Sequence, residues 1–370
     1  MTTVPPVPGR DPFPLADDVP LAPLTTLELG GKARHLVRAR DEGAVSDAVA
    51  WAAARGLPLV VLGGGSNVVV PDAGVDGVVL KIETRGVTWN EGGLVTAAAG
   101  EPWDELVAAT VARGWAGLEC LTGIPGLVGA TPIQNVGAYG QEVGDVIREV
   151  RALERRTGRV VTLPAGACGF GYRDSRFRRH PDEHVVLGVT FELRPGGAPR
   201  IAYRELEDAL VAQGLEGEAR SPAIVARTVR ALRARKSMVL DPADPNRRSV
   251  GSFFTNPIVD GAAFEALAAR AVAAGVVTTA AEVPRFEAGE GRRKVPAAWL
   301  IERAGFTKSL RRGAVGISSA HALALVHHGG GTTAALLALA QEIQDGVRAR
   351  FGVTLEREPI VLGAARPAAS

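Results

Sequence analysis

A run of three glycines is the first feature of the sequence that could bind an anion. Gly63, Gly64 and Gly65 are followed by Ser66 and Asn67. Successive glycines let backbone N–H groups point into one concavity that binds phosphate, and the two polar side chains add donors. No Gly-Lys-Ser/Thr follows, which excludes a Walker A loop, and strand-like valines follow instead of the helix that a Rossmann fingerprint requires. The run is a candidate phosphate loop, with a tight hairpin turn as the alternative.

A second glycine-rich segment, 123–140, has no regular hydrophobic period. Its small residues would let a flat ligand or a diphosphate approach the backbone closely, and its polar side chains could form hydrogen bonds to it. Its one aromatic ring, that of Tyr139, could cover an aromatic face. A structural loop wrapped over a core is the alternative. The candidate ligand-binding residues here are Pro125, Gly126, Thr131, Pro132, Gln134, Asn135, Gly137, Ala138, Tyr139 and Gly140.

Arg173 and Ser252 are candidates for the chemistry itself. A fixed guanidinium binds a carboxylate in a bidentate manner and stabilises negative charge developing beside it, so Arg173 is a candidate catalytic residue. The alternative is a surface pair with Asp174. Ser252 stands between a glycine and two phenylalanines without a Gly-x-Ser-x-Gly pattern, so a hydrolase nucleophile is not indicated. Its hydroxyl could donate a proton in an apolar pocket, or it could simply cap a turn.

A short acidic stretch near the C-terminus offers a carboxylate. Glu356 and Glu358 flank Arg357 within residues 355–360. Either carboxylate could relay a proton or orient a proton donor. An exposed charged strand is the alternative for this stretch.

The elements that must position these residues change character near residue 200. Before it, strands are expected at 57–62, 68–70, 77–81, 146–153, 159–163 and 185–194, and helices at 44–55 and 104–113. After it, helices are expected at 203–213, 223–235, 262–274 and 332–351, with strands at 322–326 and 360–362. The pattern predicts an α+β domain followed by a more helical one.

Composition excludes several broad classes of protein. With 370 residues, 46% of them hydrophobic and 22% charged, the chain is globular and long enough for two or three domains. A net charge of +2 gives no general attraction to nucleic acid or to an anionic membrane. The distant Cys120 and Cys168 indicate neither a disulfide framework nor a metal cluster. Without a signal peptide or an apolar run of about 18 residues, a soluble cytoplasmic protein is expected.

Taken together and in this order, the motifs resemble the UDP-N-acetylenolpyruvoylglucosamine reductases, flavoenzymes of bacterial cell-wall synthesis. The resemblance rests on Gly-x-Gly-Ser-Asn, Pro-Ile-Gln-Asn-x-Gly-Ala-Tyr-Gly, Gly-Tyr-Arg-Asp-Ser and Gly-Ser-Phe-Phe-x-Asn-Pro. It implies an α+β fold, with a two-lobed FAD-binding domain of the vanillyl-alcohol oxidase (PCMH) type over 25–200 and a lobe boundary near 75–90. It further implies a C-terminal α+β substrate-binding region over 201–363 whose last strand docks back, a disordered leader at 1–24 and a tail at 364–370.

The resemblance also implies the reaction. UDP-N-acetylglucosamine enolpyruvate would be reduced to UDP-N-acetylmuramate, with NADPH as hydride donor and non-covalent FAD as carrier. The product enters peptidoglycan synthesis and thereby serves cell shape and division. The expected partners are small molecules only, with no nucleic acid, membrane or metal, and a monomer is expected.

Site residues are carried over by the same resemblance. Ser252 matches the proton donor, while Arg173 and Glu358 match residues that polarise the enolpyruvyl carboxylate. Residues 63–67 and 125–140 would hold FAD. The substrate-binding positions would be Tyr172, Tyr203, Lys236, Asn256, Lys308 and His321.

The sequence departs from the family pattern at a few positions and carries one segment of a single subtype. Tyr203 lies on an extra segment that resembles a lid over bound UDP. Thr255 stands where lysine is common, and His321 stands where glutamine is common. The acidic motif, usually Glu-Pro-Glu, here contains Arg357, so Glu358 is chosen over Glu356 by alignment to the second glutamate.

Two other functions stay open at this point. Another flavin oxidase or dehydrogenase could share the fold, because a fold does not fix a reaction. Covalent flavin attachment is not expected, since His35 is the His or Cys nearest to residues 63–67. A non-catalytic flavin-binding module is the second alternative. The joint presence of Arg173, Ser252 and Glu358 argues against it, because binding FAD requires none of them.

Overall fold

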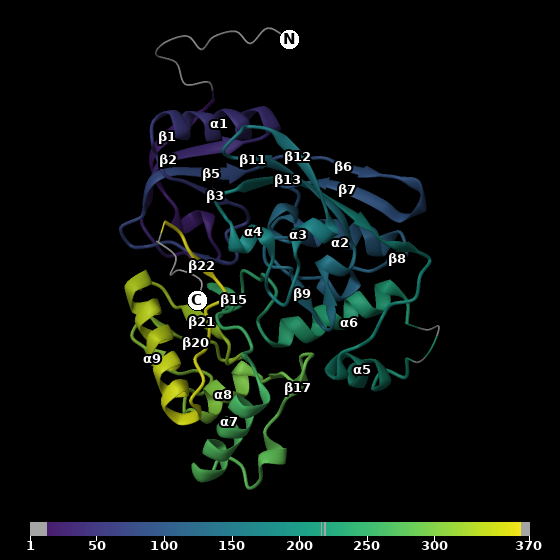
Figure 1. Ribbon diagram of the computed structural model, residues 1–370, viewed down its shortest axis with the longest axis vertical. Helices are drawn as coiled ribbons and strands as arrows, with labels where there is room; N and C mark the ends of the chain where they lie inside the picture. Colours follow the sequence, from purple (N-terminus) through teal and green to yellow (C-terminus); the bar gives the residue numbers. More distant parts are fainter. Residues whose placement is uncertain (1–12, 216, 218–219, 364–370) are drawn as a thin grey trace. The chain divides into compact units, whose positions relative to one another are not determined.

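The computed structural model describes residues 13–215, 217 and 220–363, and contacts within the chain divide it into two units (Figure 1). Unit 1 comprises the chain up to Pro20, Lys32–Gly65 and Gly74–Ala234. Unit 2 comprises Leu21–Gly31, Ser66–Ala73 and the chain from Arg235. The expected leader at 1–24 falls partly outside the described residues, and so does the expected tail at 364–370.

The first sheet of unit 1 carries the glycine loop at its edge. Its strands, in spatial order, are β1 (Leu15–Pro20), β2 (Lys32–Ala39), β5 (Val75–Ile82) and β3 (Leu59–Leu62). β2, β5 and β3 run parallel, so their carboxyl ends share one edge, and residues 63–65 follow β3 there. Helix α1 (Glu42–Ala54) packs on β2 and β5 (Figure 1) and is capped by Asp41, whose side chain accepts from the Ala44 N–H at 2.8 Å. β1 lies where the sequence predicted a disordered leader, because pairing with β2 satisfies its backbone.

A second, antiparallel sheet completes the core of unit 1. Its strands, in spatial order, are β12 (Val160–Pro164), β11 (Ile147–Glu154), β13 (His184–Glu192), β7 (Leu94–Ala98) and β6 (Val87–Trp89). The alternation over 185–194 predicted one buried face, but Val186 is buried as well as Val185 and Leu187. As the central strand, β13 is covered on both faces. The other elements here are α2 (Trp103–Ala112), β8 (Trp115–Ala116), β9 (Gly137–Ala138), β10 (Gln141–Glu142), α3 (Ala165–Cys168), α4 (Arg176–Arg179) and β14 (Arg194–Pro195).

Two helices after residue 200 also belong to unit 1. α5 (Arg204–Val211) and most of α6 (Pro222–Arg235) bury Leu206, Leu210, Val225, Val229 and Leu232 around Cys120. The last and longest stretch of unit 2 therefore begins at Arg235, whereas the sequence places the domain limit at 201. The limit of 201 rests on a change in helix content along the sequence. The apolar side chains of α5 and α6 nevertheless pack against Cys120 in unit 1.

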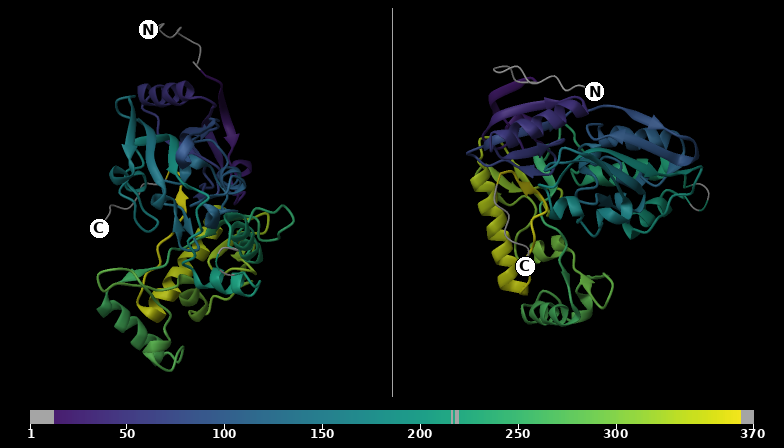
Figure 2. Two further views of the ribbon diagram at one scale, coloured as in Figure 1. Left: turned by 90° about the vertical axis from the view of Figure 1, so that its right-hand side faces the viewer. Right: turned by 45° about the horizontal axis from the view of Figure 1, so that its top comes forward.

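Unit 2 is built around one antiparallel sheet and three helices. The sheet has the order β15 (Ser249–Ser252), β21 (Ala324–His327), β20 (Val315–Ile317) and β19 (Arg311–Arg312). The long helix α9 (Thr333–Phe351), yellow in Figure 2, packs on α7 (Gly261–Ala273), α8 (Ala297–Arg303) and this sheet. The small strands are β4 (Val68–Val69) with β22 (Ile360–Val361), which run parallel, and β16 (Ile258–Val259), β18 (Arg293–Lys294) and β17 (Phe286–Glu287). The helices predicted at 262–274 and 332–351 are confirmed, while α8 was not expected.

The structure also bears on three features considered in the sequence: membrane-spanning helices, metal-ligating clusters and the two cysteines. Among the helices that the structure describes, none combines the length and apolar character needed to cross a bilayer. Within the same residues, no group of three or more His, Cys, Asp and Glu side chains is arranged to hold a metal ion. Cys120 and Cys168 are buried free thiols, and burial raises the pKa of Cys168 to about 11.

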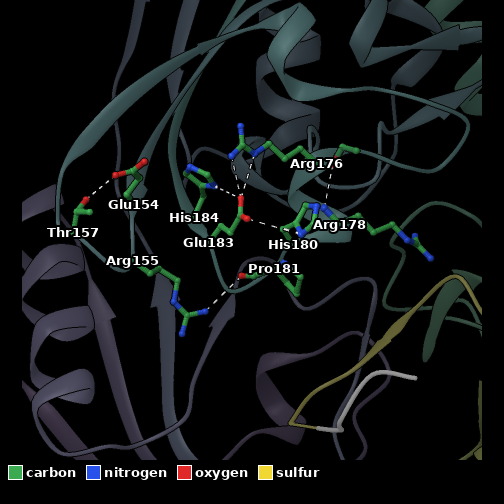
Figure 3. A network of polar contacts seen from close by, with 10 residues as sticks. Glu154, Arg155, Thr157, Arg176, Arg178, His180, Pro181, Glu183 and His184 are labelled. Atoms are coloured by element: carbon green, nitrogen blue, oxygen red, sulfur yellow. Dashed lines mark hydrogen bonds and ion pairs between the residues drawn. The ribbon is translucent and has the colours of Figure 1, made fainter. Parts of the chain in front are cut away.

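A polar network surrounds helix α4, just after the Arg173 loop (Figure 3). Arg176 donates from Nε and Nη2 to the Glu183 carboxylate at 3.3 and 3.1 Å. The adjacent His184 imidazole is only 4% exposed, with Nδ1 3.7 Å from Glu183, and its ring packs edge-on against Phe177. Burial is the main cause that lowers the pKa of His184, and Arg176 lowers it further, while Glu183 and Glu154 oppose the shift.

We expect His184 to make unfolding easier in mild acid. The imidazole has a pKa of about 6.5 in the unfolded chain and a lower pKa in the native one. The unfolded state therefore binds more protons below a pH of about 6.5, and the free energy of unfolding falls there. The test compares urea unfolding midpoints at pH 7.5 and 5.5 for wild type and H184Q. The variant should lose less stability on acidification than wild type does.

The control is H180Q, which removes an exposed imidazole from the same network. Comparing variants is necessary because burial also lowers the pKa of His327 and of His328 in unit 2. An equal loss of stability in wild type and H184Q would show that His184 makes no such contribution.

Candidate functional site

The two glycine-rich segments touch each other within unit 1. A Cβ added to Gly64 would lie 2.8 Å from the Gly126 Cα and 3.5 Å from the Leu127 nitrogen. Backbone therefore meets backbone here, and only glycine fits. Gly65, with φ +69°, makes the turn in the left-handed region. Residues 63–65 and 125–127 thus form one cradle, called the glycine cradle below, whose narrowness suits the close backbone approach of a diphosphate.

The second half of the glycine cradle is fixed from beneath. The Val128 N–H donates to the Glu101 carbonyl and the Gly129 N–H to the Ala99 carbonyl, both at 2.9 Å. A Cβ on Gly129 would lie 2.5 Å from the Ala99 Cβ. The buried Thr131 hydroxyl donates to the Val128 carbonyl at 2.8 Å. In this arrangement Thr131 shapes the loop through its own turn.

Asn135 joins the second glycine segment to the Arg173 loop. Its Nδ2 donates to Glu142 Oε2 at 2.7 Å and to the Gly171 carbonyl at 2.9 Å. Its Oδ1 accepts from the Gly144 N–H at 2.8 Å. Both amide hydrogens are used inside the chain, so Asn135 positions the two loops. The sequence makes Asn135 a cofactor-binding candidate, and that assignment stays a prediction.

Arg173 is held in place by the same segment. Its Nη2 donates to the Gly137 carbonyl at 2.6 Å, and its guanidinium carbon lies 5.5 Å from the Tyr172 ring centroid. Arg173, Asn135 and Tyr139 are three of the eight non-glycine residues with positive φ in the described chain. Such backbone costs free energy and gathers at functional sites, which agrees with the roles expected of these loops.

The expected lid residue contacts the second glycine segment. The Tyr203 and Tyr139 rings meet edge to face with centroids 5.5 Å apart. Tyr203 precedes α5 and remains 40% exposed, and burial of the remainder is the main cause that raises the pKa of its hydroxyl. Tyr203, the expected lid residue, therefore packs on a residue of the candidate cofactor loop.

Unit 2 brings the candidate serine and the acidic stretch together. The Glu358 N–H donates to the Phe253 carbonyl at 2.9 Å, and the Thr255 N–H donates to the Glu356 carbonyl at 3.0 Å. The two segments are thus antiparallel. Glu358 lies opposite the neighbour of Ser252, whereas Glu356 lies opposite Thr255 and is exposed.

Arg357 fastens this acidic stretch to helix α9. Its Nε donates to Gln344 Oε1 and its Nη2 to Gln341 Oε1, both at 3.0 Å. Gln344 in turn donates from Nε2 to the Leu355 carbonyl at 2.6 Å. Arg357 therefore fixes the segment through side-chain hydrogen bonds.

The other expected substrate-binding residues are spread over unit 2. Asn256 accepts the Ala297 N–H at 2.8 Å, so its side chain also starts helix α8. The His321 carbonyl accepts from Ala324 at 3.1 Å in the turn before β21. Lys308 is exposed, and Lys236 is half-buried just after α6. Ser66, Asn67, Ser252 and Glu358 belong to unit 2, whereas Tyr172, Arg173 and Tyr203 belong to unit 1.

Two cations near the glycine cradle, the half-buried Lys81 and the buried Arg233, were not found from the sequence. Lys81 Nζ donates to the Gly63 carbonyl at 2.6 Å. Arg233 Nη2 donates to the Gly123 carbonyl at 3.4 Å, and burial lowers the pKa of Arg233 to about 10. The sequence does contain a signal for Lys81, because it is the single charged residue in the apolar run 78–82. Arg233 stands among several arginines of one helix, where nothing distinguishes it.

Comparisons with known proteins agree with this geometry. An FAD binding domain matches residues 33–164, and the C-terminal domain of UDP-N-acetylenolpyruvoylglucosamine reductase matches residues 242–362. The reductase of Streptomyces coelicolor is 50% identical over 97% of this chain and 94% of its own length, and that of Saccharopolyspora erythraea is 50% identical over 93% and 95%. The reductase structure from Thermus caldophilus, 24% identical, shares the fold with a TM-score of 0.62 over 93% of this chain and 97% of its own. The expected FAD-binding α+β fold is confirmed, and the chain belongs to the UDP-N-acetylenolpyruvoylglucosamine reductase family.

Proposed function

We propose that this chain uses NADPH and FAD to reduce UDP-N-acetylglucosamine enolpyruvate to UDP-N-acetylmuramate in peptidoglycan synthesis. The observation that carries the proposal is the pairing of the acidic stretch with the Ser252 segment, through the Glu358-to-Phe253 hydrogen bond, in a chain 50% identical to a curated reductase. The reductase C-terminal domain match, residues 242–362, contains both Ser252 and Glu358. We further propose a cytoplasmic monomer, since UDP-sugars and NADPH are cytoplasmic metabolites.

The residues of unit 1 suit FAD. The two loops of the glycine cradle lie so close together that a Cβ on Gly64 would clash with Gly126. Such a narrow, glycine-lined backbone site suits the binding of a diphosphate. FAD, when bound, supplies the hydride transfer that amino-acid side chains cannot perform. We assign the cradle to the cofactor, together with Ser66, Asn67 and the remaining polar residues of segment 131–140. Thr131 and Asn135 act there by shaping the loops.

In unit 2 we assign proton donation to Ser252. A serine hydroxyl is a weak acid, so it gives up its proton only to a strongly basic carbon, such as the one next to the substrate carboxylate after hydride addition. The hydroxyl must therefore be held close to that carbon. β15 and its neighbours fix the serine, because the Phe253 N–H donates to the Leu323 carbonyl at 2.7 Å.

Arg173 and Glu358 are assigned to the substrate carboxylate. A guanidinium held by Gly137 needs no reorganisation to bind a carboxylate and to stabilise charge developing on it. Lys236 and Lys308 suit the UDP diphosphate as mobile point charges. Tyr203 suits a lid over the nucleotide, while Tyr172, Asn256 and His321 complete the proposed binding set.

A visible spectrum of the purified protein tests the proposal. The flavin band should bleach with anaerobic NADPH and return on addition of UDP-N-acetylglucosamine enolpyruvate. A colourless protein that FAD cannot reconstitute would refute the flavin assignment. A band that bleaches but returns only with oxygen would favour an oxidase.

The choice between the two glutamates gives a sharper prediction. We expect E358Q to lower the rate of flavin reoxidation by the enolpyruvyl substrate by about 10²-fold, the lower end for a lost group that supports charge developing in the transition state. E356Q should stay within about twofold of wild type, because Glu356 is exposed and lies opposite Thr255. Stopped-flow flavin absorbance with each half-reaction measured separately checks both variants. A larger defect in E356Q than in E358Q would reverse the assignment.

A further inference from the structure

Lys81 is the one charged residue in the apolar run 78–82 that forms the second half of β5. β5 runs through Val78, Val79 and Leu80, all buried, and Lys81 pairs with Leu62 on the parallel strand β3. Leu62 is the residue immediately before the glycine loop. The register of the two strands therefore places Lys81 beside the start of that loop.

The Lys81 side chain reaches the loop itself. Its Nζ donates a hydrogen bond of 2.6 Å to the carbonyl of Gly63. The side chain is half-buried, and burial is the main cause that lowers the pKa of its ammonium, with Glu83 opposing. A buried ammonium costs free energy unless it is hydrogen-bonded, so a leucine would fill this strand position at lower cost. The contact with the loop is what distinguishes lysine here.

A pocket of about 440 Å³ opens next to Lys81 at the carboxyl edge of the parallel strands. Arg40, Arg85 and Glu83 line it along with Gly100 and Leu127. Glu83 is paired with Arg38 and lies 3.7 Å from Arg40, so the balance of charge around the pocket is positive. Leu127 belongs to the glycine cradle. The cationic pocket therefore adjoins the cradle at Leu127, within unit 1.

We propose that Lys81 is a positioning residue of the cofactor site, holding the first carbonyl of the glycine loop so that Gly64 stays against Gly126. The carbonyl of Gly63 is tied back by the ammonium, which leaves the loop's N–H side for an anion. The charge also favours a diphosphate bound at the cradle. This inference rests on the proposed role of the cradle in binding FAD.

The experiment measures how tightly the holoenzyme retains FAD. Wild type, K81M, K81R and R40M are diluted in steps and passed through a protein-retaining membrane, and free FAD in the filtrate gives the dissociation constant. K81M should bind FAD at least tenfold more weakly, because it loses a hydrogen bond to a charged group. K81R, which keeps a donor and the charge, should stay within about threefold. R40M removes a positive charge from the same pocket without touching the loop and should stay within about twofold.

Circular dichroism and tryptophan fluorescence establish that each variant is folded at the assay temperature. Should K81M not fold, K81Q takes its place, since its amide is one bond too short to reach the Gly63 carbonyl, and tenfold weaker binding is again expected. Retention of FAD by K81M or K81Q within twofold of wild type would overturn the inference, and so would a K81R as weak as K81M. Wild type that retains no FAD would instead contradict the proposed function.

Discussion

Ser252→Ala should leave flavin reduction by NADPH at its wild-type rate and slow flavin reoxidation by the enolpyruvyl substrate about 10³-fold. The first half-reaction needs no protein proton donor, whereas the second must protonate the carbon next to the carboxylate. Loss of a positioned general acid costs on the order of 10² to 10⁴ in rate. Alanine keeps the strand, because Ser252 pairs with Ala324 through backbone in β15 and β21. Stopped-flow absorbance of the flavin, one half-reaction at a time, measures both effects.

Ser249→Ala is the matched control for this prediction. Ser249 lies on the same strand, β15, and its hydroxyl accepts only a long contact of 3.5 Å from Gly251. That variant should keep both half-reactions. If S252A also lost reduction by NADPH, the proton-donor role would be wrong, because a local fault of the cofactor site would explain both losses.

Gly64→Ala should weaken FAD binding by about 100-fold while leaving most of the fold intact. The added Cβ would stand 2.8 Å from the Gly126 Cα, and neither backbone can move aside as a flexible side chain can. The two halves of the glycine cradle must then separate, and overpacking by one methyl commonly costs about 1 to 3 kcal/mol. Most of this cost should appear in FAD binding, because the contact joins two loops outside the sheets. FAD retention after dilution measures it.

Gly166→Ala provides the control for steric effects. It adds the same methyl in α3, where no atom lies within 4 Å, so FAD binding should not change. If G64A retained FAD as wild type does, the close contact between residues 64 and 126 would have no part in binding. Loss of folding in G64A would show as a lost far-ultraviolet circular dichroism signal and would contradict the expectation that most of the fold stays intact.

Local features were predictable from the sequence because their physical causes lie within a few residues. Helix α9 has Leu336, Ala340 and Ile343 at helical spacing, and its start and end carry Thr332 and Gly352 as caps. The glycine loops were predictable for a similar reason, since only glycine gives the backbone such freedom. The order and spacing of the four motifs then identified the family, and the comparisons confirmed it.

The sequence did not predict which distant segments of the chain pack or pair with one another. β1 lies inside the leader expected at 1–24, which was predicted from the prolines of the N-terminus, and only pairing with β2 makes it a strand. Helices α5 and α6 looked like the start of the second domain, yet their apolar faces pack around Cys120 of unit 1. The different roles proposed for Glu356 and Glu358 rest on which backbone lies opposite each of them.

The sequence by itself determined the family, the cofactor and the residue types that the reaction needs, because those are written in short motifs. Only the tertiary structure shows that Lys81 contacts the glycine loop, that the Asn135 amide donates hydrogen bonds to two loops, and that Gly64 contacts Gly126. These contacts join residues that lie 7 to 62 positions apart in the sequence. Hydrophobic periodicity reports which face of an element is buried, but not which distant backbone it will meet.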